Sequence, residues 1–520
     1  DSSTSRGLGD VYKRQICDKT WEIFFQLKVT ITISFEKPNT IFCWTSVTIQ
    51  LNYQDKIRGM NQIMNTKNKF KSTLLLATGA LLIGVTAIQA TTANAATTTA
   101  TASTKTTTAK TATTKRYDAQ ITTPKSLASG YQIYSNVPGT KNTTGVATTT
   151  TDSTKYNNQY VRVMQTQKTK TATYAQIRYN GKILGWMNVN GLKQVSFKSI
   201  AQATMQKYDA IGTVLVSHNK SLTPTIVNNG YANMLHSTKN TSDGSVVYPL
   251  ASLQNTMTGA MIQQLINAKK ITATTTLSKY YPKVAHSKTI TIQQLLTMTS
   301  GIKGTIKTPD DQVTEDQAYT NAVKALTSTN KHTFTYSDIN YVLLAGIISQ
   351  VTGKSYTQNL QSRILNKLGM KNTYIVNENQ PEFTAIKAVG YNNANNNDYQ
   401  NSQAVSYPTL SSLPGAGNVL TTPTDYYKFV LGLQNGKVLT TKGYQALTGY
   451  STKYSGGMYV NQKTVKYNNG SYTGTGFNTG YYASDGNQKV VVALLNQSPL
   501  KNKMTPATFL NKMNTIATYY

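Results

Sequence analysis

Two polar residues, Ser252 and Asn255, stand three positions apart at the start of the clearest helical pattern in the chain. A serine at a helix N-terminus has free backbone N–H groups and the positive end of the helix dipole beside it, and both stabilise an oxyanion. Ser252 is therefore a candidate nucleophile for attack on a carbonyl carbon. The apolar residues that follow at helical spacing are Leu253, Met257, Ala260, Met261, Leu265 and Ile266.

Asn255 lies one helical turn after Ser252, on the same helix face. A carboxamide has no basic lone pair at neutral pH, so it cannot take the proton from the serine hydroxyl. Loss of a general base lowers the rate roughly 10²–10⁴-fold. The pair predicts either impaired catalysis or a base supplied from elsewhere in the chain.

Other serines and the histidines offer no better site. A serine followed three positions later by a lysine occurs four times after residue 95, but none of these serines precedes a suitable amphipathic helix, and the pattern arises often by chance in a chain rich in serine and lysine. The four serines are Ser217, Ser300, Ser328 and Ser498. The histidines lack metal-ligand spacing such as H-E-x-x-H, so we predict neither a metal nor another cofactor. They are expected to be surface or packing residues: His218, His236, His286 and His332.

The order of segments in residues 206–520 resembles the serine β-lactamase and D-alanyl-D-alanine carboxypeptidase superfamily, nearest its class C and esterase-like branch. The resemblance rests on an opening hairpin and on the segments YPLASLQNTMTGAMI, TITIQQLLTMTSGI, FTYSDINYVLLAGIISQVTGKSY, LPGAGNVLTTPTDYYKFV and GTGFNTGYYASDGNQKVVVALLNQS. It implies an α/β (α+β) transpeptidase-like domain, with an antiparallel sheet flanked by helices and an all-helical part. It also implies that Ser252 is the nucleophile of an S-x-x-K motif whose lysine is replaced by Asn255.

The second family motif, Tyr-x-Asn, reads Tyr336-Ser337-Asp338. The resemblance makes Tyr336 the base or proton relay. Asp338 stands where an amide is expected. An ionised carboxylate there would be a poorer donor to a substrate carbonyl and would repel an anionic substrate.

The third family motif, Lys/His-x-Gly on the strand that faces the nucleophile, has no good match. The nearest candidates for substrate binding are Asn469, Gly470 and Ser471, or a neighbouring register, followed by Thr475 and Gly476. No lysine or histidine precedes Thr475, so the cation that usually receives a substrate carboxylate is missing. Met298 also stands where relatives often carry histidine.

Residues 116–195 predict a small β module ahead of this domain. Short alternating segments, among them 160–164 and 174–179, are separated by turn signals that include Asn180-Gly181. The next segment contains Gly185-Trp186, and the whole resembles the GW module, an SH3-like β-barrel that fastens surface proteins to teichoic acids. Trp186 is expected to be a core residue as well. A single copy predicts weak wall binding without further modules.

The front of the chain predicts export. Residues 1–63 read as non-coding or disordered sequence, and the start is expected at Met60 or Met64. Residues 64–95 resemble a signal peptide, with three lysines before an apolar run at 74–88 and a small-x-small cleavage site ending at Ala95. A Thr/Ala/Lys-rich linker follows at 96–115. Both cysteines, Cys17 and Cys43, precede the predicted mature chain, so no disulfide is expected there.

The charge predicts an anionic partner. The chain has 52 Lys and Arg against 20 Asp and Glu, and residues 1–95 hold 11 and 6 of these, which leaves 41 against 14, a net of about +27. For an exported chain without a nucleic-acid motif, we expect peptidoglycan and teichoic acids as partners, with non-covalent retention in a Gram-positive wall and no stable membrane span.

Two functions follow from these motifs. The first is a wall-associated protein that recognises peptidoglycan-type ligands and is catalytically impaired at Asn255. The second is an active carboxypeptidase, β-lactamase or esterase that uses Ser252 with Tyr336 as base, where the missing cation favours esterase chemistry. An adhesive role at host surfaces rests on charge alone. Lysine and asparagine codons differ only at the third base, which leaves a recent loss and a sequencing error open as explanations of Asn255.

Overall fold

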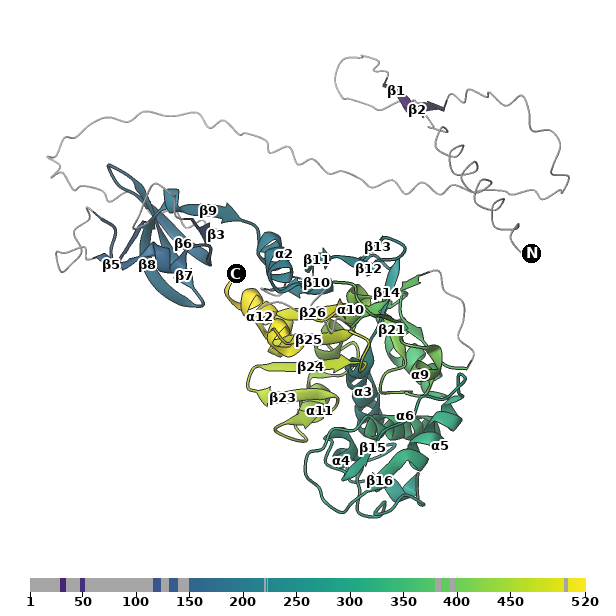
Figure 1. Ribbon diagram of the computed structural model, residues 1–520. Helices are drawn as coiled ribbons and strands as arrows, with labels where there is room; N and C mark the ends of the chain where they lie inside the picture. Colours follow the sequence, from purple (N-terminus) through teal and green to yellow (C-terminus); the bar gives the residue numbers. More distant parts are fainter. Residues whose placement is uncertain are drawn as a thin grey trace, which may run out of the picture. The chain divides into compact units, whose positions relative to one another are not determined.

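The computed structural model describes residues 29–33, 47–51, 116–122, 131–138, 149–218, 221, 223–378, 385–392, 398–499 and 504–520 (Figure 1). The chain forms two units, residues 1–103 and 104–520. In the first unit, β1 (Val29–Ile33) pairs antiparallel with β2 (Val47–Leu51). The predicted start codons, signal peptide, cysteines and linker all lie outside the described residues. Among those residues, no helix is both long and apolar enough to cross a bilayer.

The predicted β module is an antiparallel sheet in the order β5-β4-β8-β7-β6-β3-β9. Its core is a separate apolar cluster that includes Ile133, Val161 and Ile177. The pairings end at β5 and β9, so closure into an SH3-like barrel stays a prediction. The strands are β3 (Tyr117–Ile121), β4 (Gln132–Tyr134), β5 (Thr149–Asp152), β6 (Tyr160–Lys168), β7 (Thr173–Tyr179), β8 (Lys182–Asn188) and β9 (Leu192–Val195).

The backbone geometry of this module explains the Asn180-Gly181 and Gly185-Trp186 pairs of the sequence. Asn180 and Gly181 both have positive φ, 45° and 84°, as the predicted tight hairpin between β7 and β8 requires. Gly185 has φ 139°, and a Cβ there would lie 2.4 Å from the Tyr134 carbonyl oxygen on β4. Only glycine fits this approach. Trp186 is 8% exposed, which confirms that it is a buried residue.

We therefore expect Gly185→Val to unfold the module selectively. The clash with the β4 backbone, added to the unfavourable φ, should cost roughly 2–4 kcal/mol. Trp186 is the only tryptophan after residue 44, so its fluorescence in a chain of residues 96–520 reports on this module alone. A red-shifted emission with unchanged melting of the larger domain is the expected result. An unchanged spectrum would contradict this explanation of the Gly-Trp pair.

The larger domain is built on an antiparallel sheet in the order β11-β10-β26-β25-β24-β23-β22. The predicted hairpin is confirmed as β10 paired with β11, and the predicted strand near the end is confirmed as β26. Helices α2 (Phe197–Tyr208) and α12 (Pro506–Tyr519) pack against one face of the sheet (Figure 1). The first element is thus α2, which begins before the predicted boundary at 206. The strands are β10 (Ile211–Ser217), β11 (Thr225–Asn229), β22 (Tyr454–Ser455), β23 (Met458–Gln462), β24 (Val465–Ser471), β25 (Asn478–Ser484) and β26 (Val490–Gln497).

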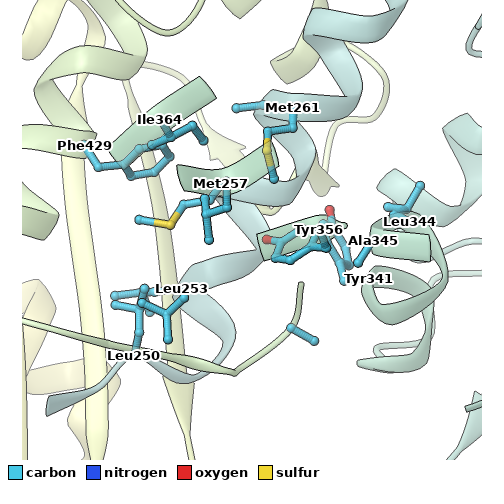
Figure 2. Packing of buried hydrophobic residues seen from close by; sticks show 14 of the residues in the cluster. Leu250, Leu253, Met257, Met261, Tyr341, Leu344, Ala345, Tyr356, Ile364 and Phe429 are labelled. Atoms are coloured by element: carbon cyan, nitrogen blue, oxygen red, sulfur yellow. The ribbon is translucent and has the colours of Figure 1, made fainter. Parts of the chain in front are cut away.

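The other face of the sheet carries the helical part of the domain, with α3 (Gln254–Asn267) at its centre. Figure 2 shows Met257 and Met261 of α3 with Ile364 and Phe429 to the left and Tyr356 to the right. Because both flanks are packed, α3 is buried almost all round, including its polar residues. The neighbouring helices are α4 (Ile292–Leu296), α5 (Glu315–Ala325), α6 (Ile339–Thr352), α7 (Tyr356–Leu360), α10 (Pro423–Gln434) and α11 (Thr441–Thr448).

Candidate active site

Ser252 lies in the short turn that joins β14 (Val246–Pro249) to α3, as the helical pattern predicted. The preceding residue, Ala251, has φ 53°, a conformation that costs a non-glycine residue about 1–3 kcal/mol. On the sheet side, a Cβ at Gly470 of β24 would lie 2.7 Å from the Ser252 backbone nitrogen. Glycine at 470 therefore lets the strand pass directly beside the candidate nucleophile.

Asn255 is fully buried, and its amide is turned toward two tyrosines. Its Nδ2 donates to the Tyr336 hydroxyl at 3.0 Å and to the Tyr454 hydroxyl at 3.3 Å. Its Oδ1 has no hydrogen-bond partner. The amide nitrogen that donates these hydrogen bonds has no basic lone pair, so it cannot take a proton from Tyr336 or from Ser252. The geometry is that of a structural donor.

Tyr336 brings its hydroxyl into the same cluster. The residue is 37% exposed overall, but its hydroxyl end lies inside, against the buried Asn255. Burial, then the nearby Asp338 carboxyl and Tyr454, raise the pKa of Tyr336 well above its usual range, while the Ser252 hydroxyl lowers it. None of these neighbours is a cation. Tyr336 is therefore protonated at neutral pH and cannot act as a base in this state.

Asp338 supplies the one carboxyl of the site. Burial raises the pKa of this carboxyl, against the side chains of Tyr336 and Ser252, which lower it. Its Oδ1 has no hydrogen-bond partner. A carboxylate with an unpaired oxygen, in the same cavity lining as Ser252, is a candidate acceptor for the proton of the Ser252 hydroxyl. Asp338 thus lies in the cluster, as the Tyr-x-Asn motif predicted, but it brings a carboxyl group where the motif has an amide.

The raised pKa of Asp338 also predicts a pH-dependent stability. The folded chain holds this proton more tightly than the unfolded chain, so ionising Asp338 weakens the fold as pH rises from the usual carboxyl range. Asp338→Asn should therefore raise the free energy of unfolding at pH 7 by about 1 kcal/mol. Below both pKa values the two proteins should be equally stable. Chemical denaturation at pH 7 and pH 3.5 checks this, and an equal gain at both would rule out titration as its cause.

A cavity of about 280 Å³ opens onto these residues, and none of its lining side chains is Lys, Arg or His. Asp338 supplies the single carboxyl group of the cavity lining. A substrate carboxylate would find no cation in this cavity and would meet a negative charge. An ammonium or a neutral group suits it better. The lining residues are Ala251, Ser252, Gly304, Thr305, Ile306, Tyr336, Ser337, Asp338, Ile339, Leu413, Ala416, Ser471, Tyr472 and Thr473.

Only part of the predicted substrate-binding set reaches this cavity. Ser471 lines it and Gly470 lies against Ser252. Asn469 is exposed, because successive side chains of β24 point to opposite faces. Thr475 and Gly476 do not line the cavity either: Thr475 donates to the Tyr472 carbonyl oxygen, and Gly476 packs against the Tyr391 backbone. The register shifted by one residue, which begins at Asn468, agrees better with the structure than the one that begins at Asn469.

Two residues of the site escaped the sequence analysis. Asn468 is fully buried, and its Nδ2 donates to the Ser252 carbonyl oxygen at 2.8 Å. Asn468 could have been predicted from the sequence, because it stands two residues before Gly470 and therefore on the same face of the strand. Tyr454 is fully buried beside Asn255. No local pattern identified it, because it comes from β22, about 200 residues further along the chain.

The remaining candidates lie elsewhere. None of the four histidines or the four alternative serines lines the cavity. Met298 is buried and its sulfur accepts from the Asn340 amide at 3.4 Å. Within the described ranges, no group of three or more His, Cys, Asp or Glu is placed to hold a metal ion.

Comparisons with known proteins place both parts of the chain. The profile of the Beta-lactamase family matches residues 185–512, and that of the GW (Gly-Tryp) dipeptide domain matches residues 110–193. A putative penicillin-binding protein, PbpX of Bacillus subtilis, is 32% identical over 263 residues, which cover 48% of this chain and 62% of the relative. A teichoic acid D-alanine hydrolase of Staphylococcus aureus is 32% identical over 275 residues, 51% of this chain and 65% of that protein. The chain thus spans less than two thirds of either relative.

Solved structures agree with the fold. The crystal structure of FmtA from Staphylococcus aureus superposes with a TM-score of 0.53 at 26% identity, covering 62% of this chain and 90% of the other. A D-amino acid amidase from Ochrobactrum anthropi gives a TM-score of 0.53 at 18% identity, covering 62% of this chain and 98% of the other. This likeness supports the predicted sheet-and-helix architecture.

Proposed function

Because the chain belongs to the beta-lactamase family and carries a GW dipeptide domain, we propose that it is an exported, wall-associated protein whose larger domain recognises peptidoglycan-type ligands with little or no turnover. The GW domain and the excess of positive charge hold it on anionic wall polymers, without a covalent link. The cavity beside Ser252 supplies the recognition.

One observation carries the impaired chemistry. Asn255 donates its amide hydrogens to Tyr336 and Tyr454, so the place one helical turn after Ser252 holds a proton donor and no base. Tyr336 does not compensate, since its pKa is raised with no cation beside it. The Ser252 hydroxyl is left without the strong base that nucleophilic catalysis by serine needs.

The wall-binding part is tested by sedimentation with purified Gram-positive walls. A chain of residues 96–520 should pellet with walls in 0.1 M salt and be released in 1 M salt, because the Debye length falls from about 10 Å to about 3 Å. Ser252→Ala should pellet to the same extent, since its hydroxyl has no part in charge-driven retention. Gly185→Val should pellet markedly less. Binding that resists 1 M salt, or that needs Ser252, would count against this proposal.

A second candidate function rests on Asp338. The carboxyl and Ser252 line the same cavity, and no Lys, Arg or His lines it. This arrangement suits slow hydrolysis of an ester whose acyl group bears an ammonium, such as an alanyl ester, with Asp338 as base. The similarity to a teichoic acid D-alanine hydrolase supports this choice of ester.

A further inference from the structure

A second cavity in the larger domain, of about 410 Å³, is lined with positive charge. It lies where the end of α3, the end of α6 and the segment after α7 meet, and it shares no residue with the cavity at Ser252. Lys270, Lys354 and Arg363 line it, and no Asp or Glu does. Within the described residues, none of the three forms a salt bridge.

Arg363 is held in place by a buried amide. Asn359 is 1% exposed, and its Nδ2 donates to the Thr352 hydroxyl at 2.8 Å and to the Ser355 carbonyl oxygen at 2.9 Å. Its Oδ1 accepts from Arg363 Nε at 2.8 Å. This bond fixes the guanidinium through Nε, and no hydrogen bond engages its two terminal NH₂ groups within the described chain. A fork oriented in this way is prepared for two oxygens of one anion.

The residue type at 363 sharpens this argument. Arg363 is the only arginine after Arg178, in a stretch that otherwise uses lysine for positive charge. It lies in a π-helical segment, Gln361–Leu365, between α7 and α8 (Asn366–Leu368). Such segments occur often at functional sites. Arginine differs from lysine in its planar, bidentate donor geometry, which matches phosphate.

Within the described residues, the nearby acids form no salt bridge with the three cations. Lys354 also lines a neighbouring cavity whose lining includes three acids, Glu315, Asp316 and Glu378. The Glu315 carboxylate is already engaged by the Tyr356 and Thr357 backbone N–H groups at 2.6 and 2.9 Å. The carbonyl ends of α3 and α6 are the negative ends of their helix dipoles, which attract cations here and oppose an anion, so the three cations must outweigh them for an anion to bind. Three cations are left facing one cavity.

We infer that this cavity binds a phosphate group, with Arg363 as the bidentate ligand and Lys270 and Lys354 as additional charges. The cavity has room for a phosphate with an attached polyol unit, and the wall location proposed above makes a phosphodiester chain built on a polyol the expected source of that phosphate. The phosphate chemistry stands on the pocket alone; only the polymer's source rests on the wall location proposed above.

Calorimetric titration of the chain 96–520 tests this inference with three probes: inorganic phosphate, a short glycerol phosphate oligomer, and polyglutamate with the same number of charges. We expect the oligomer to bind more tightly than polyglutamate and inorganic phosphate to compete with it. Arg363→Lys keeps the charge but loses the fork, and should weaken oligomer binding about tenfold. Lys367→Gln removes a charge one turn away that does not line the cavity, and should change binding less than twofold.

Equal binding of polyglutamate, or equal losses in Arg363→Lys and Lys367→Gln, would overturn the inference in favour of unspecific charge. No binding of either phosphate probe would also overturn it. If Arg363→Lys lowers the melting temperature, the exposed pair Lys270→Gln and Lys354→Gln carries the test instead, and should reduce the slope of log affinity against log salt by about two. Wall sedimentation of Gly185→Val, which leaves this cavity intact, separates this result from failure of the GW domain.

Discussion

Asn255→Lys should raise the rate of Ser252 acylation by roughly 10²–10⁴-fold, the range that a positioned general base contributes. Lysine at 255 would place an amine one turn from Ser252, where Nδ2 of the amide now donates to Tyr336. In its protonated form the same amine would instead place a positive charge beside Tyr336 and lower the raised pKa of that phenol, since an opposite charge favours the anionic form. Labelling by a fluorescent penicillin or a fluorophosphonate, followed over time, measures the gain.

The control for this substitution is the double variant Ser252→Ala with Asn255→Lys, which should not label. Asn255→Gln offers a matched amide that cannot supply a base and should label no faster than the native chain. A gain in Asn255→Gln equal to that in Asn255→Lys would mean that space at position 255, and not basicity, limits acylation.

The second large effect is expected at Asp338. If its carboxylate receives the proton of Ser252, any residual hydrolysis of an alanyl ester by the native chain should fall about 10²-fold in Asp338→Asn. The native rate should rise with pH through the raised pKa of Asp338 and then level off, because only the ionised carboxyl accepts a proton. In Asp338→Asn that rise should disappear. The pH profile of ester hydrolysis from pH 4 to 8 measures both.

A structural role for Asp338 would give a different result. Asp338→Asn would then leave the shape of the pH profile unaltered, whatever its effect on the melting temperature. Residual hydrolysis that survives Asp338→Asn and is lost in Tyr336→Phe would instead favour Tyr336 as the base.

Local patterns in the sequence were enough to predict much of the fold. Short stretches of sequence, by alternation or by helical spacing, were enough to predict the hairpin of β10 and β11, strand β26 and the helix after Ser252. Gly185 could be placed in the GW domain from its motif. The steric reason for it, the approach of the Tyr134 carbonyl oxygen, is visible only in the structure.

The site was predicted less completely, because it is assembled from contacts far apart in the chain. Ser252, Asn255, Tyr336 and Asp338 were identified from motif order, and the structure brings them together. Tyr454 could not be identified, since its approach to Asn255 depends on how β22 joins the sheet. The sequence left the register of Asn469, Gly470 and Ser471 open by one residue, and the structure places Asn468 beside Ser252 with Asn469 on the opposite strand face.

The most direct test of impaired nucleophilic chemistry is the acylation rate of the native chain, followed by intact mass during incubation with a penicillin or a fluorophosphonate. We predict an acyl-enzyme at Ser252 that forms at least about 10²-fold more slowly than in Asn255→Lys. Rapid formation of that adduct by native protein, followed by its release, would contradict the conclusion that an amide at position 255 disables Ser252.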